Sequence, residues 1–323
     1  MTTEKILLSG LVAPLIAIGM TMTAPKSVAA DDYPSSTITI VSPFSAGGGV
    51  DTTVRVLANH LPEALGGTTV LVQNRAGAGG SMGAQWFTAN ASPDGYTLLA
   101  AGASNHYSVP WAQNVDYHPI DDFIWIARVS VLPAAVVVRK DLPVDDLEGL
   151  VAYLRENEVT YAHTGFGGRE WLQALAIEDA IGAAGMVGIP FDGGGQAAAA
   201  VAAGDADITF VGLPGAEPLE AQGLLKILGM IGPAPATRPD MATFEEAGFD
   251  ILPVMSHVGI AAPVGTPDAI VEKLAEAIKT TLESDSFRSA AETAGIQVAY
   301  LAGDEYRSTM AALYETSGKF MNR

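Results

Sequence analysis

Residues 37–65 read TITIVSPFSAGGGVDTTVRVLANHLPEAL, and this stretch decides the fold class. Residues 37–42 are rich in β-branched side chains and predict a strand that ends at Pro43. Residues 51–65 predict a helix, because four apolar residues recur on one face at helical spacing: Val54, Leu57, Ala58 and Leu61. The strand and the helix are joined by a loop with three consecutive glycines, residues 44–49. A strand, a glycine loop and a helix in this order begin an α/β sheet of the doubly wound type.

The same unit recurs along the chain. We expect further strands at residues 69–73, 96–101, 122–129, 134–139, 160–163, 207–211, 225–231 and 257–262. We expect further helices at residues 81–89, 147–156, 169–181, 196–203, 267–284 and 303–320. Pro133 separates two of the strands, and the chain is expected to leave a first lobe there and to return to it with the last helices. The pattern predicts two lobes, each a mostly parallel sheet flanked by helices.

Glycine precedes a helix in four loops, at residues 46–49, 77–80, 165–168 and 193–195. Open α/β sheets bind ligands at the carboxyl ends of their strands, where glycine lets the backbone approach closely and helix starts offer free N–H groups. The alternative is that each loop is only a tight turn. Because four loops share this position, we expect a clamp for a small anion.

Composition limits the possible functions. The chain has 323 residues, is 49% hydrophobic and carries a net charge of −19. This length suggests two domains, and the charge argues against nucleic acid as a partner. The chain has no cysteine, which excludes disulfides, thiolate metal sites and a lipid-modified N-terminal cysteine. We expect no cofactor and no metal site, since the five histidines show no metal-binding spacing.

The first thirty residues predict a cleaved signal peptide. Lys5 precedes an uncharged apolar run at residues 6–22, and small residues occupy Val28 and Ala30. The chain then becomes acidic, so we expect cleavage after Ala30. The mature protein is then expected in the periplasm. The alternative is a retained membrane anchor, but the run is short and broken by Pro14.

Nucleotide and hydrolase motifs do not fit. The pattern that starts at Gly77 has its third glycine one residue late, at Gly83, and no P-loop exists. Residues 79–83 read GGSMG, which would make Ser81 a hydrolase nucleophile, yet the expected strand ends too far upstream for a nucleophile elbow. We keep an exported hydrolase that uses Ser81 as an alternative to the function inferred below.

Seven motifs follow one another in order along the mature chain. They are Pro43-Phe44-x-x-Gly47-Gly48-x-x-Asp51-x-x-x-Arg55, Asn74-Arg75-x-Gly77-Ala78-Gly79-Gly80, Pro93-Asp94-Gly95-Tyr96, Asp121-Asp122-Phe123, Gly193-Gly194-Gly195, Gly204-x-x-Asp207 and Ala262-Pro263-x-Gly265-Thr266-Pro267. In these motifs and their order, the chain resembles the substrate-binding proteins of tripartite tricarboxylate transporters, also called the Bug or TctC family.

The resemblance implies a two-lobed periplasmic binding protein of the type 2, Venus flytrap kind. Such a protein closes on a small organic acid and delivers it to a membrane permease with one large and one small subunit. Residues 31–130 and 250–323 would form the first lobe and residues 131–249 the second, and the protein would be a non-catalytic monomer. A sensor that presents the same fold to a membrane kinase is a further alternative. The ligand-binding residues that the resemblance implies are Phe44, Ser45, Ala46, Gly47, Gly48, Asp51, Ala78, Gly79, Gly80, Ser104, Asn105, Thr164, Gly165, Gly167, Phe191, Asp192 and Gly193.

Two positions depart from the family pattern. Many relatives have Ser and His in the third loop, where this chain has Gly168 and Trp171. The fourth loop carries Asp192 where relatives often have a polar or basic residue. A carboxylate there would repel a second ligand carboxylate and favour a hydroxyl or amino group; alternatively, Asp192 caps the following helix.

Overall fold

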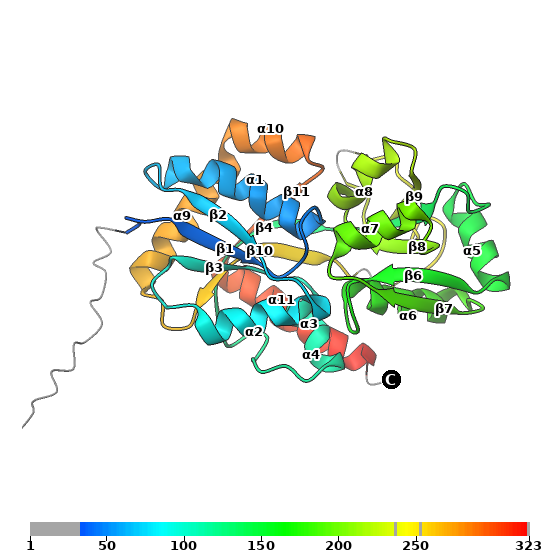
Figure 1. The fold of residues 1–323 in the computed structure, drawn as a ribbon, viewed down its shortest axis with the longest axis horizontal. Coiled ribbons are helices and arrows are strands. Elements are labelled where there is room, and N and C mark those ends of the chain that lie inside the picture. The colour runs from blue at the N-terminus through cyan, green and yellow to red at the C-terminus, as the bar shows by residue number, and fades with distance from the viewer. Residues whose placement is uncertain (1–32, 236–237, 252–253, 322–323) are drawn as a thin grey trace, which may run out of the picture.

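The computed structural model describes residues 33–235, 238–251 and 254–321. Their strands form two sheets, each the centre of one lobe (Figure 1). Lobe 1 is built on a six-stranded sheet of order β11-β4-β10-β3-β1-β2. These strands are β1 (Ile38–Ser42), β2 (Val70–Asn74), β3 (Thr97–Ala101), β4 (Phe123–Leu132), β10 (Ser256–Pro263) and β11 (Gln297–Ala302).

Lobe 2 is built on a five-stranded sheet of order β7-β6-β8-β5-β9 within the described residues. Its strands are β5 (Ala134–Arg139), β6 (Val159–His163), β7 (Met186–Pro190), β8 (Ile208–Val211) and β9 (Leu225–Ile231). The predicted signal peptide, residues 1–30, lies outside the described residues. The two-lobed α/β fold expected from the sequence is confirmed.

Helices cover both faces of each sheet (Figure 1). Lobe 1 contains α1 (Gly49–Ala64), η2 (Ala78–Gly80), α2 (Ser81–Asn90), α3 (Ser104–Tyr107), α4 (Val109–Ala112), α9 (Asp268–Glu283), α10 (Asp285–Thr293) and α11 (Gly303–Met321). Lobe 2 contains α5 (Leu147–Glu156), α6 (Arg169–Ile181), α7 (Gly194–Ala203) and α8 (Leu213–Glu220).

Alternation along the strands divides each core into two layers. In β3, Leu98 packs with α1 and α9, whereas Leu99 packs on the opposite face with α2 and α11. In β5, Val136 packs toward α5 and α6, whereas Val137 packs toward α7 and α8. Strands buried on both faces in this way explain the continuous apolar runs of the sequence.

Each sheet contains both parallel and antiparallel strand pairs, because some of its strands run opposite to the others. Strands β1 to β4 share one direction, as do β6 to β9, while β10, β11 and β5 run the opposite way. Strand β4 ends at Leu132 and β5 begins at Ala134, so the chain enters the second sheet from the junction between the lobes. The carboxyl ends of β1, β3, β6 and β8 consequently face that junction.

Several elements were not expected from the sequence: β7, β11, α8, α10 and the short helices α3 and α4. The helix expected at residues 51–65 begins two residues earlier, at Gly49, inside the first glycine loop. None of the helices in the described residues is long and apolar enough to span a membrane.

Candidate functional site

The four glycine loops meet in pairs between the lobes. The first loop of lobe 1 contacts the fourth loop of lobe 2, where the Ser45 N–H donates to the Asp192 carbonyl at 3.3 Å. A methyl group added at Gly193 would lie 2.3 Å from Ser45 Oγ and 2.8 Å from Ser45 N. One added at Gly48 would lie 3.2 Å from Gly195 N. These glycines therefore allow the two backbones to touch.

The second and third loops form the other pair. A methyl group at Gly165 would lie 2.8 Å from Gly79 N, and Ser108 Oγ donates to the Gly167 carbonyl at 2.6 Å. The predicted residues Ala78, Gly79, Gly165 and Gly167 are thus brought together as lobe-to-lobe contacts, whereas Gly80 packs against Phe44 and Asn105 of its own lobe. None of these five residues lines the cavity described next.

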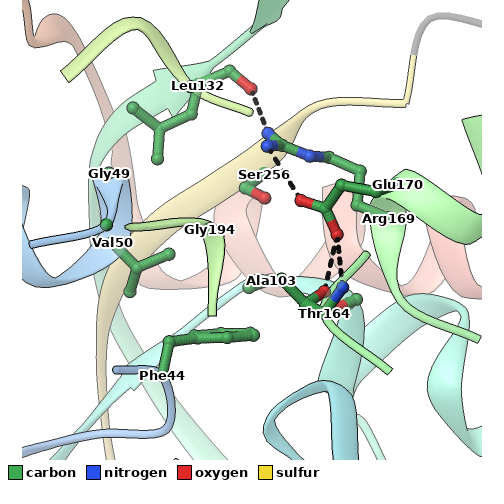
Figure 2. A pocket seen from close by; sticks show the side chains of 13 residues that line it. Phe44, Gly49, Val50, Ala103, Leu132, Thr164, Arg169, Glu170, Gly194 and Ser256 are labelled. Carbon is green, nitrogen blue, oxygen red and sulfur yellow. Dashed lines mark hydrogen bonds and ion pairs between the residues drawn. The ribbon is translucent and has the colours of Figure 1, made fainter. Parts of the chain in front are cut away.

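A cavity of about 40 Å³ lies between the loop pairs (Figure 2). Four predicted residues line it: Phe44, Gly48, Ser104 and Thr164. Gly49 and Gly194 also line it and belong to the glycine loops expected to form the clamp. The remaining lining residues were not predicted: Val50, Ala103, Leu132, Arg169, Glu170, Gly212 and Ser256. This volume holds only a few water molecules, so the two lobes are closed on each other.

Helix starts surround the cavity without side-chain caps. The N-cap residues of α1, α6, α7 and α8 are Gly48, Gly168, Gly193 and Gly212, and none of these helices has a side-chain cap hydrogen bond. By contrast, Asp146 caps α5, far from the cavity. Free N–H groups and the positive ends of several helix dipoles favour an anion at this place.

Asp51 organises the first loop from behind. Its carboxylate accepts hydrogen bonds from Gly47 N at 2.9 Å, from Arg55 Nε at 2.9 Å and from Asn74 Nδ2 at 2.7 Å. Asn74 Nδ2 also donates to the Phe44 carbonyl. The carboxylate is buried and absent from the cavity lining. Asp51 therefore positions the loop that carries Ser45 to Gly49 without reaching a ligand there.

Asp192 does neither of the two things expected from the sequence. Its side chain is exposed and does not line the cavity, and the N-cap of α7 is Gly193 without a side-chain cap bond. The neighbouring Phe191 is half-buried and packs on the core of lobe 2. The cavity is therefore free of the Asp192 charge.

Asn105 is fully buried next to the cavity-lining Ser104. Its backbone carbonyl accepts from Tyr117 Oη at 2.6 Å, while its side-chain amide has no hydrogen-bond partner among the described residues. Ser104 Oγ donates to the Gly79 carbonyl at 3.1 Å. The two residues thus support the second loop, and only Ser104 reaches the cavity.

The cavity wall contains a buried ion pair that was not expected from the sequence. Arg169 is 6% exposed and Glu170 2% exposed, and Arg169 Nη2 lies 3.3 Å from Glu170 Oε1. Glu170 Oε2 accepts from Thr164 Oγ1 at 2.6 Å and from Thr164 N at 3.3 Å. Both residues occupy the first turn of α6, and the departure from the family pattern beside them was the one available signal.

Arg169 also joins the lobes. Its Nη1 donates to the Leu132 carbonyl at the end of β4, and its Nη2 donates to the Phe210 carbonyl in β8. Tyr107 is buried close by, and this burial raises the pKa of its phenol above the ordinary value, against the opposing effect of Arg169. The buried phenol, which does not line the cavity, therefore stays neutral.

The geometry does not support a nucleophile at Ser81. Its hydroxyl is buried and donates to the Ala78 carbonyl at 2.9 Å, and no histidine is among its hydrogen-bond partners in the described part of the chain. Ser81 opens α2 after η2, well beyond the end of β2 at Asn74. No cluster of three or more potential metal ligands occurs among the described residues.

Comparison with known proteins decides the family. The profile described as "Tripartite tricarboxylate transporter family receptor" matches residues 53–322. The chain belongs to this receptor family. Two relatives are a UPF0065 protein of Agrobacterium vitis, 33% identical over 290 residues, and protein BugT of Bordetella pertussis, 30% identical over 289 residues. The alignments cover 87% and 88% of this chain, and 82% and 88% of the relatives.

Solved structures of similar receptors share the whole fold. MatC from Rhodopseudomonas palustris, solved with bound malate, has a TM-score of 0.81 at 27% identity and covers 89% of this chain and 99% of its own. A second R. palustris protein, solved with adipate, has a TM-score of 0.82 at 25% identity, with coverages of 90% and 98%. The resemblance to the tripartite tricarboxylate transporter receptors is thereby confirmed.

Proposed function

We propose that this protein is the periplasmic receptor of a tripartite tricarboxylate-type transporter and binds a small organic carboxylate between its lobes. The observation that carries the proposal is the convergence of uncapped helix starts from both lobes on one cavity. The global charge of −19 opposes an anion, so local dipoles must hold it. The malate and adipate in similar receptors support the same ligand class.

The carboxylate would be bound mainly by backbone N–H groups at Gly48, Gly49 and Gly194, with Phe44 beneath it. Hydrogen bonds to a charged group contribute roughly 1.5 to 3 kcal/mol each, and micromolar affinity needs about 8 kcal/mol. Several such bonds therefore suffice. A four-carbon acid is larger than the present cavity, so the lobes would open to admit it.

The lobe boundaries and the export signal remain part of the proposal. Residues 31–130 and 250–323 would form lobe 1 and residues 131–249 lobe 2; the sheet that each strand joins supports this division, with β4 of lobe 1 running two residues further, to Leu132. Residues 1–30 would direct export and be removed after Ala30, which N-terminal sequencing of the periplasmic protein tests. The receptor would deliver its ligand to a permease with one large and one small subunit.

Native mass spectrometry of the protein purified from periplasm, followed by calorimetric titration with malate, succinate and adipate, tests the proposed function. We expect at least one acid to bind with micromolar or tighter affinity and no acid or ester to be turned over. The Ser81→Ala variant serves as the control and is expected to behave like the natural protein. Turnover that disappears in this variant would instead establish the hydrolase.

A further inference from the structure

The two sides of the cavity differ in chemistry. On one side lie Gly49 and Val50 with Gly194, where α1 and α7 begin and free N–H groups are available (Figure 2). On the other side lie Glu170, in the first turn of α6, and Thr164, in the loop after β6 (Figure 2). The first side suits a carboxylate. The second side presents a buried carboxylate of its own.

Glu170 retains capacity to accept a hydrogen bond. An ionised carboxylate offers about four acceptor positions. Thr164 supplies two donors to Oε2, while Oε1 accepts only from Arg169, at 3.3 Å, among the described residues. The hydroxyls of Ser104 and Ser256 line the same cavity. A ligand hydroxyl or ammonium group could therefore complete the bonding of Oε1.

Arg169 fixes Glu170 and directs three of its five N–H groups to protein acceptors. Both protons of Nη2 are directed to protein acceptors, Glu170 Oε1 and the Phe210 carbonyl, and Nη1 donates to the Leu132 carbonyl. Its Nε is buried and without a partner among the described residues. The guanidinium thus compensates the charge of Glu170 in the folded protein while leaving the carboxylate at the cavity surface.

From this arrangement we propose that Glu170 determines specificity: the receptor selects a short acid with one carboxylate and, at the other end, a hydroxyl or amino group. The inference rests on the proposed function and names its substrate class. A second ligand carboxylate would lie against Glu170, and like charges in such contact repel each other. The specificity that the sequence suggested for Asp192 thus belongs to a residue that the structure places in the cavity wall.

The test compares acids with the same four-carbon chain. Succinate, γ-hydroxybutyrate and γ-aminobutyrate are titrated calorimetrically against the natural protein and against Glu170→Gln. We expect the natural protein to bind one of the two donor-bearing acids about tenfold or more tightly than succinate. In Glu170→Gln this preference should fall by about tenfold or more, because the amide no longer repels a carboxylate.

Asp179→Asn is the matched control. Asp179 is exposed on the same helix, so the substitution removes the same charge without changing the cavity, and the preference should persist. Glu170→Asp, which keeps the charge, should also retain the order of affinities. If Glu170→Gln does not fold, the order measured on the natural protein decides.

Three results would contradict the proposal. Tightest binding of succinate by the natural protein would overturn the role of Glu170 and leave the proposed function standing. An unchanged preference in Glu170→Gln would do the same. Failure of every acid, malate and adipate included, would overturn both the specificity and the carboxylate receptor.

Discussion

Gly193 is a glycine because of its neighbour rather than its own backbone conformation. Its φ is 174°, an extended value that any residue adopts. The restriction comes from Ser45 in the opposite lobe, which would lie 2.3 Å (Oγ) and 2.8 Å (N) from an added methyl group. Gly193 thus allows the lobes to approach this closely, and a glycine is required here only when they are closed.

Gly193→Ala should weaken ligand binding by about tenfold, because overpacking the closed contact costs roughly 1–3 kcal/mol. The free energy of unfolding should change little. Gly204→Ala is the control: its φ is +86° and no atom lies within 4 Å of the added methyl group. That variant should lose about 1 kcal/mol of stability and keep its affinity. Equal affinity losses in both variants would contradict the closure role; calorimetry and urea unfolding provide the two measurements.

Residue patterns predicted the place of the site better than its lining. The four glycine loops were recognisable because glycine between a strand and a helix is typical of ligand-binding loops in α/β sheets. Arg169 and Glu170 were not recognisable, because their contacts with Leu132 and Thr164 depend on where α6 begins relative to the crossing between the lobes. Asp192 misled, since its position in a glycine loop does not determine where its side chain points.

At the scale of elements, α6 connects to both segments where the chain crosses between lobes. Arg169 and Gln173 are four residues apart and so share a helix face. Arg169 Nη1 donates to the Leu132 carbonyl before the first crossing, and Gln173 Nε2 donates to the Val254 carbonyl after the second, at 3.0 Å each. Helix α6, which starts at the cavity, therefore also binds both segments that cross between the lobes.

Gln173→Leu should lower the free energy of unfolding by about 1–3 kcal/mol, because the buried Val254 carbonyl loses its donor. Gln222→Leu, at an exposed glutamine, should change stability by less than about 0.5 kcal/mol. Urea denaturation of both variants measures the difference. If the two variants prove equally stable, the Gln173 bond does not contribute to holding the crossing.

Elements with strong periodicity were predicted, including the edge strands β2 and β9, whereas the edge strands β7 and β11 were missed. Strand β7 lies at the edge of its sheet and is largely exposed, so it lacks an apolar face that would indicate a strand. Strand β11 also lies at an edge, beside β4. Helix α10 follows α9 after a single residue, Ser284, whose side chain accepts from Phe287 N and starts the new helix. These boundaries depend on caps and edge contacts rather than on hydrophobic period.

Over the whole molecule, two buried histidines should make stability depend on pH. Burial lowers the pKa of His106 to about 4; burial and the nearby Arg128 lower that of His257 to about 4 as well. The unfolded chain binds these protons near pH 6.5. Stability is therefore complete above about pH 6.5 and is lost as the pH falls toward 4, by about 3 kcal/mol for each histidine.

Urea unfolding near pH 7 and near pH 4 measures this loss. His257→Gln should show a smaller decrease than the natural protein, because one of the two protonation sites is gone. Identical decreases would show that His257 does not contribute to the acid sensitivity.

The paired glycine loops have a consequence for how efficiently the receptor would bind ligand for the proposed transport. The hydrogen bonds that Ser45 and Ser108 donate across the lobes have protein acceptors only. They therefore stabilise the closed state whether or not a ligand is bound. Receptors that close without ligand cannot bind it, so the apparent affinity falls in proportion to the fraction of receptors that remains open. If the receptor delivers its ligand to a permease, as proposed, empty closed receptors would have nearly the same outline as loaded ones and would compete with them for binding to the permease.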